Sequence, residues 1–413
     1  MNLRNLSTDI FLKYIIFLFP IFIIIGNAAI NFALMLVLVI YFFRCFREKK
    51  IIFFDTYEFK YFCFFYIYLL VNSFQSEDIQ NSLIRTIFYI KFFVFALIYQ
   101  NFIEEKKINL KKLGIFWFII ILILCLDIIH QSILGYNIFN YTSVSIARNS
   151  GLFFDELVAG GFLLSFVFII YFLIFKKNNY LYLYLVSFLI IIYLTGERSN
   201  FLKFTFVFLC IYFTYKKAGL TSEIISLLVS GIIILFILTS FTNIKNRYLS
   251  TISFSNNKNL SLIETYLTSE YGSHTFSSYL ILKDNLFFGV GNKNFRNSCK
   301  LYSNEVIDLQ KKIELGSESY YPSGCATHPH QIYNEFLSEH GIFGTLIMFY
   351  LFFKLIFKNL SINKTSYLNL ICFFYIITYF IPILPSGSFF STLTSILFWF
   401  NFVFYKINFN KYD

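Results

Sequence analysis

Long apolar segments alternate with short polar ones along almost the whole chain. Each apolar segment holds roughly 20 residues, and a helix of that length crosses the ~30 Å hydrocarbon core of a bilayer. A backbone in lipid must satisfy its own hydrogen bonds, so these segments predict membrane-spanning helices; the short alternating strands of a barrel are not seen in the sequence. The predicted spans are 9–26, 28–46, 59–74, 84–102, 113–134, 155–175, 180–195, 198–215, 224–242, 332–357, 366–384 and 389–406.

One long polar segment, residues 243–331, interrupts this pattern between the ninth and tenth predicted spans. It divides the chain into a first group of spans within 1–242, the loop itself, and a second group within 332–413. The mixed stretch 260–286 predicts one or two amphipathic helices, and the glycine-rich turn GVGNKNFR follows at 289–296. A loop this long without a role is uncommon. The predicted fold is therefore an all-α integral membrane protein with about twelve transmembrane helices and one large loop containing short amphipathic helices.

Composition and charge agree with this fold class. Hydrophobic residues make up 57% of the chain, charged residues only 14%, and the mean hydropathy is +0.65, far from the averages of soluble domains. Lys and Arg gather in the short loops after the even-numbered predicted spans, and loops of this kind stay in the cytoplasm. Both termini are therefore predicted to be cytoplasmic, with the long loop on the outer face. The net charge of +11 follows from this topology. Its excess basic residues face the lipids of the cytoplasmic leaflet, and no nucleic acid is expected as a partner.

The seven cysteines fall into two groups. Five lie in predicted spans, where they are expected as small apolar residues. Cys299 and Cys325 are the two in the outer loop, and an oxidising compartment would join them and close a loop of about 26 residues. The alternative is a pair of free thiols, which the outer face disfavours. A Cys299–Cys325 disulfide is therefore predicted.

The sequence His328-Pro329-His330-Gln331 stands directly before the tenth predicted span. Histidine titrates near neutrality, so it suits proton transfer. Pro329 fixes the backbone before His330, and Glu339 follows in the same predicted helix. We expect His330 to act as a general base with His328 beside it; the alternative is a solvated histidine at a helix start. No companion ligands at metal-site spacing accompany the two histidines, so no metal is expected.

Three cations occupy positions that call for an explanation. Arg198 lies in the tight outer turn TGERSN, against the usual charge bias, and a guanidinium suits two-pronged phosphate contact. The alternative is an ion pair with Glu197. Arg148 lies in an outer loop, where the carboxylates at 155–156 offer a pairing alternative. Lys91 falls inside a predicted span, where a charge is expensive and usually marks a partner or a pathway. If such groups converge, they form a pocket for a membrane-borne anion such as a lipid diphosphate.

Four motifs together resemble the bacterial O-antigen ligases. The arrangement His330-Gln331, nine residues, Gly341, two residues, Gly344 is similar to the histidine motif of that family. TGERSN resembles its short outer turn with a functional arginine, and KDNLFFGVGNKNF resembles its loop helix ending in a Gly-x-Gly turn. PSGSFF, at 385–390, resembles the last outer turn. The motifs stand in the family's order, and the resemblance covers most of the chain.

The resemblance implies a metal-independent, inverting glycosyltransferase that needs no cofactor. Such enzymes work on the periplasmic side of the bacterial inner membrane and take a glycan from an undecaprenyl-diphosphate donor. In ligases the acceptor is lipid A–core, and in polymerases it is a second lipid-linked repeat unit. A ligase-like function is the favoured expectation, with a polymerase as the alternative. A transporter or flippase for a lipid-linked sugar is less favoured, because it leaves the large outer loop and its histidines without a role.

The resemblance also assigns roles to residues. His330 corresponds to the catalytic histidine, and Arg198 to a diphosphate-binding arginine. Family ligases carry another arginine early in the loop helix, but EYGSHTFSSYL has none here; His274 is the nearest candidate and Arg296 a possible substitute. We expect His330 and Arg198 to face one cavity at the outer membrane boundary. The other predicted substrate-binding residues are Arg148, Lys91, His274, His328 and Arg296.

Overall fold

The computed structural model describes residues 3–48, 57–105, 108–145, 147–175, 181–214, 243–247, 260–313, 322–357, 366–382 and 384–407. Helices dominate these residues. Within them there is no β-strand, only an isolated bridge between Tyr136 and Thr142. The prediction of an all-α protein is therefore confirmed for the described part of the chain.

Helices occupy each predicted span before the loop except 224–242, which lies outside the described residues. The first span is divided, because α1 ends at Phe17 and α2 begins at Phe19 with Pro20 in its first turn, where a missing N–H does no harm. The helices are α1 (Leu3–Phe17), α2 (Phe19–Ile25), α3 (Asn27–Glu48), α4 (Tyr57–Phe74), α5 (Ile79–Glu104), α6 (Leu110–Leu134), α7 (Ala159–Ile174), α8 (Leu181–Leu194) and α9 (Arg198–Thr214), with a 3₁₀ turn η1 (Gly151–Phe153).

The loop and the last group of helices follow. The stretch 260–286 forms two helices, and serines cap both: Ser261 shares a capping box with Glu264, and Ser269 accepts the N–H of Gly272. The elements are α12 (Leu262–Leu267), α13 (Glu270–Asp284), α14 (Phe295–Ser298), η2 (Cys299–Tyr302), α15 (Ser303–Ile313), α16 (Ile332–Phe357), α17 (Tyr367–Ile377), η3 (Thr378–Phe380) and α18 (Thr392–Lys406).

Among the described residues, four helical segments are long and apolar enough to cross a membrane: Asn27–Arg47, Ile79–Glu104, Leu110–Leu134 and Ile332–Phe357. Shorter apolar helices cover Ala159–Ile174, Leu181–Leu194 and Tyr367–Phe380. Several such helices in one chain describe a multi-pass membrane protein. The number of twelve spans stays a prediction.

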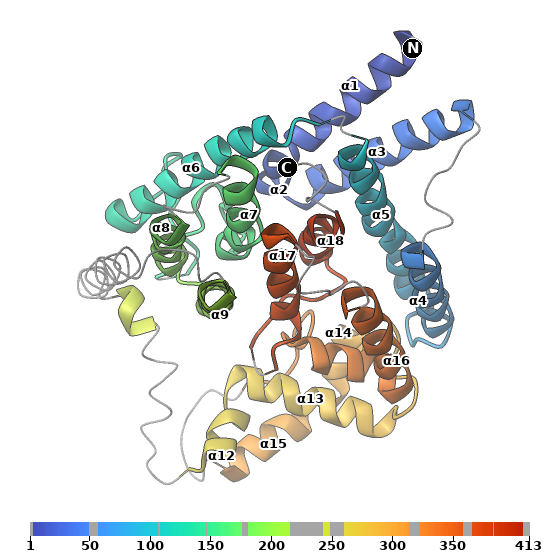
Figure 1. The fold of residues 1–413 in the computed structure, drawn as a ribbon. Coiled ribbons are helices and arrows are strands. Elements are labelled where there is room, and N and C mark those ends of the chain that lie inside the picture. Colours follow the sequence, from blue (N-terminus) through green and yellow to red (C-terminus); the bar gives the residue numbers. More distant parts are fainter. Residues whose placement is uncertain are drawn as a thin grey trace.

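Helix α18 lies in the middle of the bundle, between α5 and α17 (Figure 1). Its Trp399 meets the stacked rings of Phe62 and Phe93 edge-on, at centroid distances of 5.7 Å and 5.1 Å, and donates to the hydroxyl of Tyr89 at 3.1 Å. The loop helices α12, α13 and α15 gather at one end of the bundle, beside α14 and α16 (Figure 1). The aromatic core thus holds the long helices, and the candidate chemistry lies at the end that the loop covers.

Candidate functional site

Helix α16, which follows the two histidines, is broken at Gly341, where φ is 63° and ψ is −169°. Segment 286–291 of the loop fills the break with four backbone hydrogen bonds of 2.8–3.2 Å. The residue pairs that they join are Val290–Ser338, Gly291–Glu339, Ile342–Leu286 and Phe343–Phe287. The loop therefore supplies partners for backbone groups that the kink removes from the helix ladder.

The glycines of the two motifs make this close approach possible. A Cβ on Gly289 would lie 2.5 Å from the backbone nitrogen of His340, and a Cβ on Gly341 would lie 2.4 Å from the carbonyl carbon of Phe287. Both glycines also have positive φ, which side chains disfavour. Gly289 of the Gly-x-Gly turn and Gly341 of the Gly-x-x-Gly pair are thus two sides of one backbone contact.

Two buried glutamates of α16 tie two loops together. Glu339 accepts the backbone N–H groups of Lys293 at 2.7 Å and of Phe295 at 3.4 Å. Glu335 accepts the hydroxyl of Ser388 and, at 2.8 Å, the backbone N–H of the next residue. The ammonium of Lys293 lies 3.8 Å from Glu335 and donates to Ser388. The glycine-rich turn and the PSGSFF turn are thus fixed to one helix through one charged network.

Sequence reasoning missed Lys293 and Glu335. Glu335 had a usable signal, since a carboxylate in the first turn of an apolar span is expensive without a partner. Lys293 had a weaker one, because a lysine in a glycine-rich turn looks like an exposed residue until the contact with α16 is known.

Three predicted histidines come together where α13 meets the start of α16. The ring of His330 lies 4.1 Å from that of His328 and 5.3 Å from that of His274, measured between centroids. His330 has a φ of 54°, and its carbonyl accepts the N–H of Ser386 at 2.7 Å. The PSGSFF turn therefore holds the backbone of His330 in an uncommon conformation. Both ring nitrogens of His274 are buried and, among the described residues, have no hydrogen-bond partner.

Burial sets the protonation of the two histidines that precede α16. It is the main cause that lowers the pKa of His328 to about 4, with Lys293 as the next contributor. It likewise lowers the pKa of His330 to about 4, and the neighbouring His328 adds to the effect. Both imidazoles are therefore neutral at pH 7, the form that accepts a proton, and the same burial makes each a weaker base than a free imidazole.

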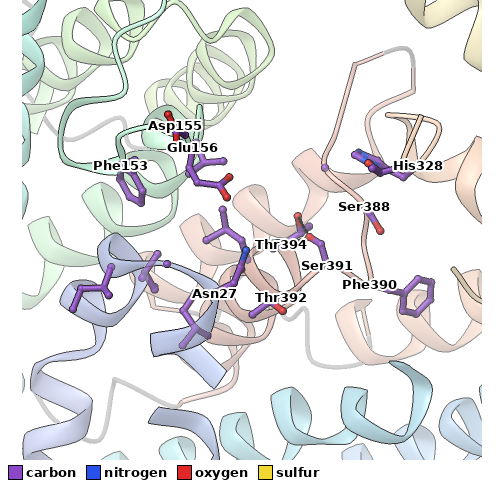
Figure 2. Close-up of a pocket in the computed structure, with 18 of the residues that line it drawn as sticks. Asn27, Phe153, Asp155, Glu156, His328, Ser388, Phe390, Ser391, Thr392 and Thr394 are labelled. Atoms are coloured by element: carbon purple, nitrogen blue, oxygen red, sulfur yellow. Dashed lines mark hydrogen bonds between the residues drawn. The ribbon is translucent and has the colours of Figure 1, made fainter. Parts of the chain in front are cut away.

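A cavity of about 1130 Å³ lies beside this cluster (Figure 2). Its basic residues are Arg85, Lys293, Arg296 and His328. Its apolar residues include Ile23, Ile24, Ile25, Ile30, Leu152 and Phe153. In Figure 2, Asp155 and Glu156 lie on the side opposite His328 and Ser388. The cavity lining thus holds both cationic and apolar residues, which suits a ligand that carries an anionic group and a lipid chain.

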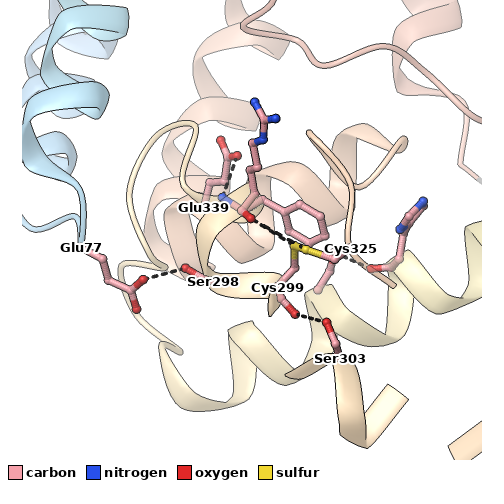
Figure 3. Close-up of a disulfide and its surroundings, with 10 residues drawn as sticks. Glu77, Ser298, Cys299, Ser303, Cys325 and Glu339 are labelled. Atoms are coloured by element: carbon pink, nitrogen blue, oxygen red, sulfur yellow. Dashed lines mark hydrogen bonds between the residues drawn. A yellow bond between two sulfur atoms is a disulfide. The ribbon is translucent and has the colours of Figure 1, made fainter. Parts of the chain in front are cut away.

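A disulfide joins Cys299 and Cys325, as the sequence predicts, with their Cα atoms 5.2 Å apart (Figure 3). It connects the end of α14 to the segment that leads into His328. The neighbouring Ser298 donates to Glu77 at 3.0 Å, in the turn between α4 and α5. The bridge therefore holds Arg296 and His328, both lining the cavity, on one fixed framework.

The two predicted arginines lie at a second place: Arg198 in the TGERSN turn and Arg148 in the outer loop before α7. Arg198, at the start of α9, donates to the carbonyl of Arg247 at 3.2 Å, and Arg247 donates to Gly196 at 3.0 Å. Arg148 donates to the carbonyl of Leu157 at 3.0 Å. In the described part of the chain, no ion pair joins Arg198 to Glu197 or Arg148 to the carboxylates at 155–156. Neither arginine is among the residues that line the cavity.

Glu197 instead accepts hydrogen bonds from the start of α7 and from its own turn. It accepts the N–H of Gly160 at 2.8 Å and a hydrogen bond from the amide of Asn200. Burial raises the pKa of Glu197, while the hydrogen bond from Gly160 and the charge of Arg148 oppose the shift. The turn is thus ordered by the glutamate, which leaves the guanidinium of Arg198 to make its contacts elsewhere.

Lys91 also lies away from the cavity. Its ammonium sits 5.6 Å and 5.1 Å from the ring centroids of Phe88 and Phe92 on the same helix, a cation–π arrangement.

The 3₁₀ turn η3 links the helix after the arginine turn to the segment after the histidines. Lys203 of α9 lies over the ring of Tyr379 at 5.8 Å, and the carbonyl of the next residue accepts the hydroxyl of Tyr333, three residues after His330, at 2.7 Å. A cavity shared by Arg198 and His330 stays a prediction.

Comparison with known proteins gives one match. Residues 183–349 match the family model described as O-Antigen ligase. No curated protein and no solved structure matches the chain. The matched region runs from α8 into α16, so it includes the arginine turn, the loop with its disulfide, the three clustered histidines and the two buried glutamates.

Proposed function

Since the chain belongs, through residues 183–349, to the O-antigen ligase and polymerase superfamily, we propose that it is a membrane glycosyltransferase of the ligase type. It transfers a glycan from an undecaprenyl-diphosphate donor to lipid A–core, on the periplasmic face of the bacterial inner membrane. The observation that carries the proposal is the contact of His330 with His328, which lines a cavity that also holds cationic and apolar residues.

The proposed chemistry needs one base and several cations. His330 takes the proton of an acceptor hydroxyl, and that oxygen forms a bond to the anomeric carbon of the donor sugar. The bond from the anomeric carbon to the diphosphate oxygen breaks, and the diphosphate leaves with the electron pair. Attack from the side opposite the leaving group inverts the anomeric carbon. A glycosyl diphosphate already has a good leaving group, so neither a metal nor a cofactor is required in this scheme.

Cations stabilise the charge that develops on the diphosphate. Arg198 is the first candidate, supported by its position in the TGERSN turn and by the contacts of η3 with both α9 and Tyr333. Arg296 and His328 are supported by their place on the cavity wall, and His274 by its contact with His330. Arg148 adds charge near the arginine turn, while Lys91 has the weakest support.

A polymerase would use the same chemistry with a second lipid-linked repeat unit as the acceptor. Gel analysis of lipopolysaccharide from a deletion strain separates the two functions. Loss of all long glycan from core, with lipid-linked polymer retained, is the result expected of a ligase. Core carrying one repeat unit would indicate a polymerase. An unchanged glycan pattern, or donor trapped on the cytoplasmic side as expected for a flippase, would contradict glycan transfer.

A further inference from the structure

Lys293 has a backbone conformation that its residue type disfavours. Its φ is 63°, in the left-handed region that glycine adopts freely and other residues seldom enter. The same turn already uses glycine at 289 and 291, where φ is also positive. A lysine held in such a conformation indicates a role for its side chain, because strained residues persist where the surrounding structure enforces them.

Contacts with neighbouring residues hold Lys293 in this backbone conformation. Its N–H donates to Glu339 at 2.7 Å, and its ammonium donates to Ser388 and lies 3.8 Å from Glu335. The side chain is only 12% exposed, yet Lys293 and Ser388 both line the cavity. Glu335 already accepts two other hydrogen bonds, from the hydroxyl at 388 and the N–H at 389. The ammonium is therefore fixed at the cavity wall and is not the sole partner of that carboxylate.

Two further cations line the same cavity. Arg296 lies three residues beyond Lys293, and Arg85 comes from α5. The carboxylates of the cavity, Asp155 and Glu156, lie on the side away from His328 and Ser388 (Figure 2). The lining thus holds three cations, and its two carboxylates lie away from Ser388, the residue that Lys293 contacts; clustered cations of this kind bind phosphate groups.

We propose that Lys293, together with Arg85 and Arg296, binds a phosphate group of a lipid-linked saccharide in this cavity. The inference rests on the proposed function and adds a binding residue to it. Lys293 moves no proton; its ammonium acts as a fixed point charge and hydrogen-bond donor to a phosphate oxygen. The phosphate belongs either to the diphosphate of the donor or to a phosphorylated acceptor, and the two sources are separable by experiment.

The test uses the full chain purified in lipid nanodiscs, with farnesyl diphosphate as the binding probe and farnesol as the probe without phosphate. Lys293→Gly removes the ammonium and suits the positive φ, so the turn is expected to fold. Lys293→Gly combined with Glu335→Gln also restores the charge balance of the buried network. Lys300→Ala removes a lysine from an exposed position of the same loop and serves as the control.

In both Lys293 variants the affinity for the diphosphate probe is expected to fall about tenfold or more, or the KM for the phosphorylated acceptor to rise by the same factor. This is the effect of one lost charged hydrogen bond. Farnesol binding should not change in either variant, the double variant should keep the thermal midpoint, and the Lys300→Ala control should match the wild type in every measurement. A rise in donor KM assigns the phosphate to the donor, and a rise in acceptor KM alone assigns it to the acceptor. Wild-type values for both substrates in the double variant would overturn the inference, because Lys293 would then only neutralise Glu335.

Failure of the inference differs from failure of the proposed function. A wild-type chain that transfers glycan, with Lys293 variants that bind and react equally well, sinks the inference alone. The wild-type chain could instead bind the diphosphate through Lys293 and still transfer no glycan from a donor that cells do consume. That result would contradict the proposed function and leave the phosphate site supported.

Discussion

His328 and His330 are neutral at pH 7 because burial penalises an imidazolium, and this has a consequence for stability. The unfolded chain binds protons near pH 6.5, whereas the folded chain binds them only near pH 4. Between these values the unfolded state holds more protons, so the free energy of unfolding falls as the pH falls. The stabilisation is complete above about pH 6.5 and is lost on acidification toward pH 4.

We therefore expect the thermal midpoint of the detergent-solubilised chain to fall between pH 6.5 and pH 4, by the equivalent of about 1–2 kcal/mol after allowance for solvent screening. The variant His328→Gln/His330→Gln should show a shallower pH dependence over the same window. Thermal unfolding followed by tryptophan fluorescence at several pH values gives the comparison. Equal slopes for the wild type and the variant would show that these two histidines are not the groups that titrate.

The role of His330 as a base calls for a variant that respects its backbone. Asn tolerates a positive φ but does not accept a proton, so His330→Asn should fold and lose glycan transfer by at least about 100-fold. His130→Ala is a matched control: His130 lies at the end of α6, where its ring bonds to the carbonyl of Tyr136, and it should transfer normally. Transfer is measured by complementation of a deletion strain, with expression checked. Near-normal transfer by His330→Asn would remove the base assignment.

At the scale of elements, the helices follow from the apolar runs, since runs of this length have few alternatives to a helix in lipid. The break of α16 does not follow in the same way. A glycine inside an apolar helix is tolerated, and its partner segment 286–291 stands about 50 residues earlier in the chain. Lys293 was missed for a related reason, because its conformation depends on Glu339, a tertiary contact. The histidines of the site could be predicted from residue chemistry, but their meeting with His274 depends on how α13 packs on α16.

The contact between the loop and α16 predicts a large cost for one small substitution. Gly289→Ala places a methyl group within 2.4–2.5 Å of the backbone of α16, so backbone must move, and we expect a loss of at least about 2–3 kcal/mol. Gly135→Ala is the matched control, because Gly135 also has a positive φ but nothing within 4 Å of its Cβ position; strain alone should cost about 1 kcal/mol. Thermal unfolding of both variants measures the difference. Similar thermal midpoints for the two variants would mean that the backbone of segment 286–291 moves away from α16 at little cost in free energy.

At the scale of the whole molecule, the start of α6 and the helix α15 lie at opposite ends of the bundle (Figure 1). The basic residues Lys111 and Lys112 stand at the first end, and the disulfide, the histidines and the cavity stand at the other. The positive-inside bias predicts that the first end faces the cytoplasm. A disulfide at the second end agrees with an oxidising compartment there.

This arrangement predicts the outcome of reporter fusions. A fusion after Lys112 should give a cytoplasmic signal, and a fusion after Ser303 a periplasmic one. A pair of reporters with opposite compartment requirements, such as an alkaline phosphatase and a fluorescent protein, provides each fusion with its own control. A cytoplasmic signal after Ser303 would reverse the orientation and with it the side on which a glycan is transferred.

The break in α16 also bears on how the molecule is assembled. A helix entering the bilayer with free backbone groups around Gly341 is at a disadvantage until segment 286–291 docks onto it. That segment precedes α16 in the chain, so during synthesis it is made before the helix that needs it. We therefore expect α16 to reach its final position only after segment 286–291 has docked onto it and satisfied the backbone groups around Gly341.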